Sequence, residues 1–442
     1  MRLSANTKEL KPSATLVINE TVRKKRETGE YVLNFGLGES PFPVHANIRK
    51  KLCENADKKS YLPVQGIKEL REKISIFYKV IMGLAYKPEQ IIVGPGSKIL
   101  LYDAMTSLDG PLFLPAPSWV SYQHQARLLG KDVFHVLTRS TDSYRLTPQA
   151  LEQALDAHSP DPMEQKLLLL NYPCNPTGHD FTAEQLKELA EIAKKYNVIV
   201  LSDEIYGLIS FNEKKHQSIA EYYPEGTIIT GGISKDRSLG GYRLGVALLP
   251  EQQEELLRAM LAVGSETWSC VSAPIQHAAI EAYDINDANL EYINECTSIH
   301  EIVAKYVFNR LKNARINCPA SEGAFYLFPD WNEWKEELTT YNIDTSLKLS
   351  EALLNELNIA ALPGSEFGMP ENDLSIRISL VDYDGEYALK IYRENREEAK
   401  KNTTMFIRTI APRIARACDQ LESFMTNITI LSEKNGKLKV YH

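Results

Sequence analysis

The sequence has few of the features that mark disulfide-bonded, metal-binding or membrane-spanning proteins. Only six cysteines occur in 442 residues, widely scattered and with no CxxC pair, so neither a disulfide framework nor a zinc site is expected. The HExxH and GxSxG motifs of metal and serine hydrolases are missing. No apolar run is long enough to cross a bilayer, and the first residues lack the apolar core of a signal peptide. These absences predict a protein of a reducing compartment, the cytoplasm, with no metal and no membrane partner.

Long basic runs are also missing, and the formal net charge is −8. Nucleic acid is therefore not an expected partner, although a small anionic ligand could meet a local cluster of Arg and Lys. The glycine-rich segment GPGSK at 94–98 lacks the GK[ST] order of a Walker motif, and no GxGxxG occurs. Nucleotide binding is therefore disfavoured.

What the sequence does contain is an alternation of short apolar runs and helical periods from about 51 to 315. Runs this short and apolar indicate strands buried on both faces, as in a mainly parallel sheet. Between two of them, 182–197 predicts a helix that opens with a capping box of Thr182 and Gln185. The pattern predicts an α/β fold with helices flanking a central sheet. The strands are expected at 91–93, 111–115, 133–137, 167–170, 198–201, 227–230 and 245–249.

The pattern changes after about residue 315 to shorter predicted strands separated by long polar helices. We expect strands at 325–328, 359–362 and 375–380, helices over 383–425, and a tail at 426–442 that is a short strand or disordered. This predicts a large domain over 51–315 and a smaller α+β domain over 316–442, which the N-terminal arm 1–50 completes.

Polar clusters directly follow five of the predicted strands, at the carboxyl ends where open α/β sheets bind ligands. Glycine or proline after one strand usually marks only a turn, but five clusters in chain order indicate a ligand site. The clusters are GPGSK (94–98), PAPSW (115–119), NYPCNPTG (171–178), SDEIY (202–206) and GGISKDRSLGGYRLG (231–245).

The order and content of these clusters resemble the class I/II aminotransferases of pyridoxal-phosphate fold type I, particularly the aspartate aminotransferase group. The resemblance extends from about residue 10 to 380. Its most specific parts are NPTG, the Asp-x-x-Tyr pair in SDEIY, and Ser-Lys followed eight residues later by Arg. It implies pyridoxal 5'-phosphate as cofactor and the exchange of an amino group between an amino acid and a 2-oxo acid.

The resemblance assigns cofactor contacts to residues of these clusters. Lys235 would hold the cofactor as a Schiff base, and a lysine that is partly desolvated beside other cations has the lowered pKa that a nucleophile needs. Asp203 would pair with the pyridine nitrogen, although an Asp after a strand is often only a helix N-cap. The other contacts implied are Tyr206 and Asn175 at the phenolic oxygen, Trp119 stacked on the ring, Gly96, Ser97, Lys98 and Arg243 at the phosphate, and Ser234 beside the lysine. Asn175 could instead be turn chemistry, and Trp119 a core residue.

The resemblance also assigns substrate contacts. Arg377 would bind the α-carboxylate, although an Arg on the polar face of a strand is usually only solvated. Trp119 and Asn175 would also contact the substrate. Gly38 matches a glycine near the substrate, where a side chain would obstruct it. Lys11 could meet a distal carboxylate, or could simply be solvated on the arm.

Tyr61 matches the tyrosine that reaches the phosphate of the neighbouring subunit, and so implies a homodimer with shared active sites. Two departures from the family pattern bear on the site. Gly232 stands where many relatives have a serine contact to the phosphate, and Leu-Gly-Gly-Tyr at 239–242 replaces Met-Thr-Gly-Trp.

The substrate expected from the resemblance is aspartate, glutamate or an aromatic amino acid. Two alternatives stay open. A lyase or synthase could use the same cofactor on the same fold. A non-catalytic regulatory protein is the other, but the joint retention of Lys235, Asp203, Asn175, Tyr206 and Arg377 argues against it.

Overall fold

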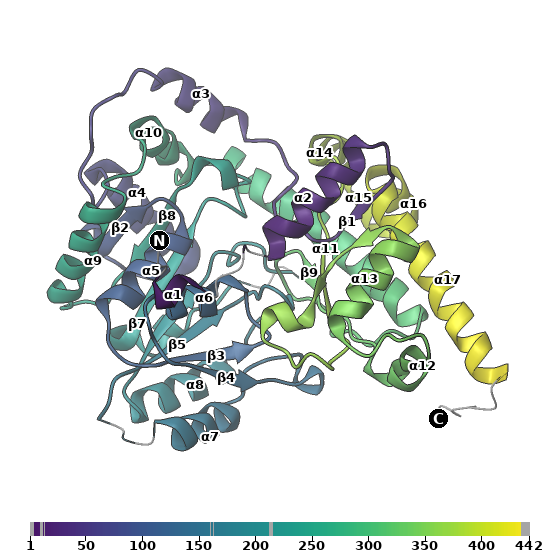
Figure 1. Cartoon of the computed structure of the whole chain (residues 1–442). Coiled ribbons are helices and arrows are strands. Elements are labelled where there is room, and N and C mark those ends of the chain that lie inside the picture. Colours follow the sequence, from purple (N-terminus) through teal and green to yellow (C-terminus); the bar gives the residue numbers. More distant parts are fainter. Residues whose placement is uncertain are drawn as a thin grey trace.

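A seven-stranded sheet forms the centre of the larger part of the molecule (Figure 1). The computed structural model describes residues 4–8, 12, 14–159, 161, 163–211 and 215–434. The strand order is β2-β8-β7-β6-β5-β3-β4, and every pair is parallel except those that β8 makes with β2 and β7. The strands are β2 (Ile91–Gly94), β3 (Leu112–Ala116), β4 (Val133–Leu137), β5 (Lys166–Asn171), β6 (Val198–Asp203), β7 (Thr227–Gly232) and β8 (Gly245–Leu248).

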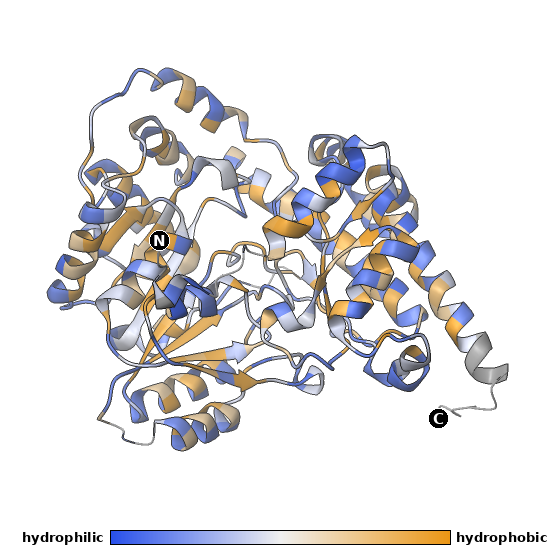
Figure 2. Ribbon diagram, in the orientation of Figure 1, coloured by the Kyte–Doolittle hydropathy of each residue, from blue (hydrophilic) through white to orange (hydrophobic). Residues whose placement is uncertain are grey.

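These strands lie where the apolar runs predict them, and the predicted α/β class with a mainly parallel sheet is confirmed. Every residue of β2, β5, β7 and β8 is buried, as the two-sided covering of a parallel sheet requires. Figure 2 shows the central strands as mostly hydrophobic ribbons. Since β5 returns to the opposite side of β3 from β4, the strand order reverses there, and the loops after β3 and β5 diverge to leave a crevice.

Helices cover both faces of this sheet. The predicted capping box is confirmed at the start of α8 (Ala183–Lys195), where Thr182 accepts from the backbone N–H of Gln185 and the Gln185 side chain accepts from that of Thr182. The apolar faces of α5 and α9 pack on one side of the strands, and those of α7 and α8 on the other. The helices of this part are α3 (Ala46–Glu54), α4 (Lys68–Phe77), α5 (Ser97–Ser107), α6 (Ser121–Leu128), α7 (Pro148–His158), α9 (Glu254–Thr267) and α10 (Ala273–Ala282).

The C-terminal part is built on two small sheets and a long helix, α11 (Asp287–Asn313), which packs against α17. One sheet is antiparallel, in the order β11-β12-β9, and the other pairs the N-terminal β1 with β10 in parallel. α11 contributes many residues to the core of this part. The domain limits at 50 and 315 stay a prediction. The remaining elements are α1 (Ala5–Lys8), α2 (Ala14–Glu27), β1 (Leu33–Asn34), β9 (Tyr326–Leu327), α12 (Lys335–Thr340), α13 (Ser346–Leu357), β10 (Ile359–Ala360), β11 (Leu362–Pro363), β12 (Ile376–Ser379), α14 (Gly385–Glu394), α15 (Arg396–Lys401), α16 (Thr403–Ile410) and α17 (Pro412–Lys434).

The structure corrects two expectations about the C-terminal part. The strand predicted at 359–362 is divided at Ala361, because its halves pair with different neighbours, β1 and β12. α17 continues to Lys434, so the tail predicted from residue 426 begins as helix, and 435–442 lie outside the described residues. In the part of the chain that the structure describes, no helix has the length and apolarity needed to cross a membrane.

Candidate active site

A cavity of about 410 Å³ lies at the carboxyl ends of the central strands, between the sheet and the C-terminal part. Its wall combines segments far apart in the sequence: α2, the loop after β1, the loops after β2, β3, β5, β6 and β7, and strands β9 and β12. The lining brings together most of the predicted site residues: Gly38, Ser97, Lys98, Trp119, Asn175, Asp203, Tyr206, Ser234, Lys235, Arg243 and Arg377.

Lys235 projects into this cavity from the turn that follows β7. Its Nζ donates to the backbone carbonyl of Gly38 at 2.6 Å and lies 5.6 Å from the centre of the Tyr206 ring. Burial and the charge of Arg377 lower the pKa of Lys235 to about 8, against the opposing effect of Glu39. A lysine with this pKa has an appreciable neutral fraction near pH 7 and can act as a nucleophile.

Asp203, the last residue of β6, forms the floor of the cavity. Its Oδ2 accepts from the Tyr122 hydroxyl at 2.7 Å, and its Oδ1 from Thr230 at 3.4 Å. The Asn171 side chain donates to the backbone carbonyl of Asp203 at 2.8 Å, which ties the ends of β5 and β6 together. Burial raises the pKa of Asp203 to about 6, although the Tyr122 hydrogen bond opposes this effect. A buried carboxylate with no cation hydrogen-bonded to it within the described residues is suited to a protonated ligand nitrogen.

Two tyrosine hydroxyls meet beside the lysine. The Tyr206 and Tyr326 hydroxyls are hydrogen-bonded at 2.8 Å, and both residues are buried. Gly38 packs against this pair so closely that a Cβ there would lie 2.0 Å from the Tyr326 hydroxyl oxygen. A side chain at position 38 would therefore force Tyr326 out of its place, which gives the predicted need for glycine a physical reason.

The N-terminus of α5 provides an anion-binding end of the cavity. Ser97 is the first residue of α5, and Gly96 precedes it with φ +100°, a conformation that favours glycine. A Cβ on Gly96 would lie 2.5 Å from Nη2 of Arg243, so the guanidinium lies directly over this turn. Lys98 adds a second cation, 4.8 Å above the Trp119 ring, and its partial burial and the charge of Arg243 lower its pKa. Free backbone N–H groups, the helix dipole and two cations together favour a phosphate.

Gly232 also has a steric reason for lacking the side chain that many relatives carry there. A Cβ at this position would lie 2.8 Å from the carbonyl oxygen of Leu244, so even a serine needs a backbone shift. The absence of a phosphate contact at this position stays a prediction, and local packing is consistent with glycine there.

Arg377, on β12, closes the opposite end of the cavity. The guanidinium is stacked over the rings of Tyr326 and Phe367, at 5.0 and 5.3 Å, and is 1% exposed. Nη1 donates to Asn175 Oδ1 at 3.3 Å, and Nη2 donates to the Gly36 carbonyl. Within the described residues no carboxylate pairs with it, and its Nε has no hydrogen-bond partner. A buried, unpaired guanidinium facing a cavity is a natural site for a ligand carboxylate.

One predicted residue lies elsewhere: Tyr61 is 91% exposed and does not line the cavity. Lys11 lies outside the described residues, and its role stays a prediction. Sequence reasoning misses several residues of the wall. Asn171 could have been found because it opens the NYPCNPTG cluster, and Glu39 and Thr15 because they lie in the family-like segments 35–40 and 10–15. No motif marks Tyr122, Tyr326 or Leu16.

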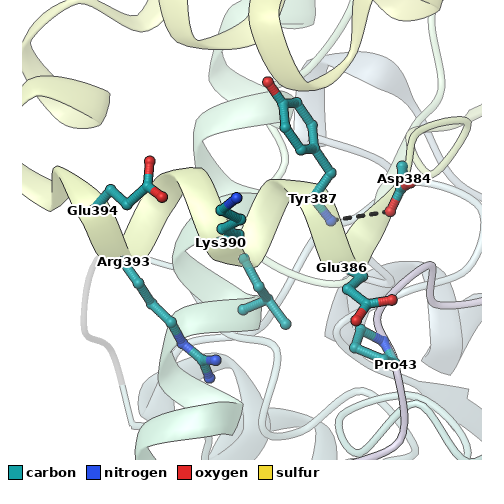
Figure 3. Close-up of a pocket in the computed structure, with 8 residues that line it drawn as sticks. Pro43, Asp384, Glu386, Tyr387, Lys390, Arg393 and Glu394 are labelled. Atoms are coloured by element: carbon teal, nitrogen blue, oxygen red, sulfur yellow. Dashed lines mark hydrogen bonds between the residues drawn. The ribbon is translucent and has the colours of Figure 1, made fainter.

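A second hollow, of about 740 Å³, lies on the far side of the C-terminal part. Figure 3 shows its side chains spread along α14, with the Tyr387 ring and the Arg393 guanidinium pointing away from each other. The hydrogen bond drawn there joins the Asp384 carboxylate to the backbone N–H of Tyr387 at 3.0 Å and caps this helix. The polar groups there do not converge, so the active-site candidate is the cavity around Lys235.

The residues of that cavity fit pyridoxal phosphate. The anion site at the start of α5 suits the phosphate, the unpaired carboxylate of Asp203 suits the ring nitrogen, and the amine of Lys235 suits an aldehyde carbon. The half-buried indole of Trp119 also lines the cavity, in reach of a planar ring.

Comparison with known proteins agrees with this geometry. The profile of the family "aminotransferase class I and II" matches residues 30–387, and the chain belongs to this family. It is 32% identical over 382 residues to an aspartate aminotransferase of Bacillus subtilis, covering 84% of this chain and 93% of that one. It is 31% identical over 378 residues to a probable aspartate/prephenate aminotransferase of Aquifex aeolicus, covering 83% and 92%. The solved structure of an aspartate aminotransferase from Thermus thermophilus with maleate has a TM-score of 0.81 at 25% identity, covering 96% of this chain and all (100%) of that one.

The predicted fold type and activity class are thereby confirmed: the protein is a pyridoxal-phosphate-dependent aminotransferase. The roles of individual residues stay predictions, which the geometry of the cavity supports.

Proposed function

We propose that the cavity around Lys235 exchanges an amino group between a 2-oxo acid and an amino acid, which is aspartate, glutamate or an aromatic amino acid. The observation that carries this proposal is the placement of Lys235 between two features of the cavity. One is the anion site at the start of α5, and the other is the unpaired guanidinium of Arg377. A ligand that bridges them presents its reacting atoms to the lysine amine.

Each residue has a distinct part in this proposal. Ser97, Lys98 and Arg243 hold the phosphate, and Asp203 keeps the ring nitrogen protonated. The bound cofactor supplies an electron sink for the charge that develops at the substrate α-carbon. Arg377 fixes the α-carboxylate, and Lys235, once free, removes the α-proton and returns it elsewhere as a general base and acid.

The exchange then takes place in two halves. The first amino acid leaves its amino group and departs as a 2-oxo acid, and a second 2-oxo acid takes the group up. Such a sequence gives ping-pong kinetics.

A dicarboxylic substrate is favoured by the excess of cations in the wall. The lining carries four basic side chains, Lys98, Lys235, Arg243 and Arg377, against two acidic ones, Glu39 and Asp203. A ligand with more than one negative charge is therefore attracted to it. The relatives named for aspartate and prephenate are consistent with this choice.

We also propose a homodimer and a cytoplasmic location. The dimer is supported by the resemblance of Tyr61 to the family tyrosine that reaches the phosphate of the neighbouring subunit, and its 91% exposure leaves it free to contact a second chain. The location is supported by the six cysteines, all of which are free thiols.

The test is a visible absorption spectrum of the purified protein before and after the addition of aspartate, glutamate or an aromatic amino acid, with Lys235→Ala as control. We expect a yellow protein whose band is replaced on addition of the amino acid and restored by a 2-oxo acid. Lys235→Ala should lose turnover by at least about 10³-fold, because both the attachment point and the proton carrier are removed.

The possible outcomes separate the alternatives. Near-normal turnover in Lys235→Ala would contradict the role of the lysine, and a protein that stays colourless with added pyridoxal phosphate would contradict the whole proposal. Product formation that is equal with and without an acceptor 2-oxo acid would instead favour a lyase or synthase.

A further inference from the structure

A buried ion pair immediately follows Lys235 in the sequence. Asp236 and Arg237 are 6% and 3% exposed, and Nη1 of Arg237 donates to Asp236 Oδ2 at 2.9 Å. Neither side chain lines the cavity, so the reaction proposed above does not use them. A buried ion pair is weak evidence for stability, since desolvation offsets most of the attraction. Its presence next to the lysine therefore calls for another explanation.

The guanidinium of Arg237 is anchored by helices on the far side of the turn. It packs against two aromatic rings that are themselves in edge-to-face contact, 4.5 Å from the centre of Phe77 on α4 and 4.7 Å from that of Tyr283 after α10. Its Nε donates at 2.7 Å to the carbonyl of Ala282, the last residue of α10. That carbonyl is one of the acceptors a helix leaves unpaired at its C-terminus, where the dipole also favours a cation. Arg237 thus fastens the turn to two helices at once.

The other end of the same turn is fastened to the cavity wall. Ser238 takes the left-handed conformation, with φ +56°, and its hydroxyl is hydrogen-bonded to that of Ser40 at 2.6 Å. Its backbone N–H donates to the carbonyl of Lys235 at 3.3 Å. Segment 38–40 is the one that also accepts the hydrogen bond from the Lys235 amine, through Gly38. The backbone of Lys235 is therefore held between the helices behind it and the wall in front of it.

We propose that Arg237, paired with Asp236, is a positioning residue that fixes the turn carrying Lys235 and so sets where its amine lies in the cavity. This inference depends on the proposed role of Lys235. Arg237 combines the two properties such an anchor needs, a planar cation that packs against aromatic rings and several donors in fixed directions. A shift of about 1 Å in a reacting group can lower a rate by about 10²-fold, so a rigid anchor under the lysine has a kinetic effect.

The experiment compares Arg237→Met with Arg237→Lys and with a matched control, Arg310→Met. Arg310 is also an ion-paired arginine close to an aromatic ring, 5.5 Å from the centre of Tyr306, but it pairs with Asp419 and Glu422 on α17, away from the cavity. For each protein we would measure kcat and KM, the visible circular dichroism of the bound cofactor, and the rate at which the cofactor-free protein takes up pyridoxal phosphate. Thermal unfolding would report stability separately.

Arg237→Met should lower kcat and the uptake rate by about 10- to 100-fold with KM changed less than about threefold, and should weaken the dichroic band. Arg237→Lys should lie between wild type and Arg237→Met, because it keeps the charge but not the fork of donors. Arg310→Met should lose stability while its kcat, uptake rate and dichroism stay as in wild type. If Arg237→Met and Arg310→Met lose stability alike and both keep wild-type kcat, uptake and dichroism, Arg237 is only structural and the proposal is overturned.

A double variant keeps the test decisive if Arg237→Met does not fold. Asp236→Asn combined with Arg237→Met leaves no uncompensated buried charge, which is the main cost of breaking such a pair. We expect it to fold and still to show the lowered kcat and uptake rate, whereas wild-type values in the double variant would overturn the proposal. Failure of the proposed function can be distinguished from failure of the proposal for Arg237. It would appear in the wild-type protein and in Lys235→Ala, whatever residue is at position 237.

Discussion

At the scale of single residues, the site shifts the pKa values of two ionisable groups in opposite directions, because each group has a different environment. Lys235 is buried and lies near Arg377, and both effects lower its pKa. Asp203 is buried among neutral hydroxyls, and burial raises its pKa to about 6. Both shifts bring the groups toward neutral pH from opposite sides, the usual sign of residues that exchange protons with a ligand.

The lysine leads to a pH prediction. Because only the neutral amine is a nucleophile and the pKa of Lys235 is lowered to about 8, uptake of pyridoxal phosphate by the cofactor-free protein should rise with pH to a plateau, with a midpoint near 8. Glu39 raises this pKa, so Glu39→Gln should move the midpoint to lower pH. The measurement is the rate of appearance of the visible band in stopped flow from about pH 6 to 10. A midpoint near the ordinary lysine value of 10.5, or one unmoved by Glu39→Gln, would contradict this account.

Residues with a motif can be predicted from the sequence, and residues defined only by their neighbours cannot. Lys235, Asp203 and Arg377 are assigned because the order of polar clusters resembles a family. Tyr122 is not, because nothing in SYQHQ distinguishes a hydroxyl that meets Asp203 from an ordinary helix residue. Tyr326 likewise acquires its place beside Tyr206 only when the C-terminal part packs on the sheet.

At the scale of secondary-structure elements, the strands of the central sheet are the most predictable feature. A strand that is buried on both faces needs a continuous apolar run, and such a run can be recognised in the sequence without knowledge of the rest of the fold. The C-terminal elements are less predictable because partners divide them. Ile359–Ala360 pairs with β1 and Leu362–Pro363 with β12, and sequence alone carries no signal for that exchange.

The turn into α5 gives a prediction at this scale. Gly96→Ala places a methyl group 2.5 Å from Nη2 of Arg243 at a φ of +100°, so it both strains the turn, by about 1–3 kcal/mol, and displaces the guanidinium. We expect the affinity of the cofactor-free protein for pyridoxal phosphate to fall by about tenfold or more, measured by quenching of tryptophan fluorescence.

Gly29→Ala is the matched control for this variant. Gly29 also has a positive φ, +85°, but a Cβ at this position would have no other atom within 4 Å, and the residue follows α2 outside the cavity. The substitution should cost stability without changing the affinity. Equal losses of affinity in both variants would show that strain alone, and not the displacement of Arg243, weakens binding.

At the scale of the whole molecule, the site exists only where three segments meet. The central sheet contributes Lys235 and Asp203, the C-terminal part contributes Arg377, and the N-terminal segment contributes Gly38 and α2. α2 is tied to the C-terminal part by Arg26, whose guanidinium pairs with the buried carboxylate of Asp382, which Arg413 of α17 also contacts. The family profile ends at residue 387, so α17 joins the support of the site from beyond the matched region.

The proposed homodimer leads to a prediction that a monomer cannot satisfy. If Tyr61 completes the phosphate site of the neighbouring subunit, Tyr61→Ala and Lys235→Ala damage different halves of one composite site. In a mixed dimer, one site would carry both substitutions and the other would carry neither. Random pairing of equal amounts should make about half of the dimers mixed and restore about a quarter of all sites.

The measurement is turnover after the two variants are mixed, dissociated and reassociated, compared with each variant treated alone. Tyr61→Ala alone should retain weak activity, since it removes one phosphate contact, and Lys235→Ala alone should have almost none. The mixture should therefore exceed the mean of the two, and the excess should appear only after subunit exchange, because it depends on new pairs and not on the presence of both proteins. If the turnover of the mixture equals the mean of the two variants and light scattering gives the mass of a monomer, the proposed homodimer is contradicted. Tyr61, 91% exposed, would then be a surface residue outside any active site.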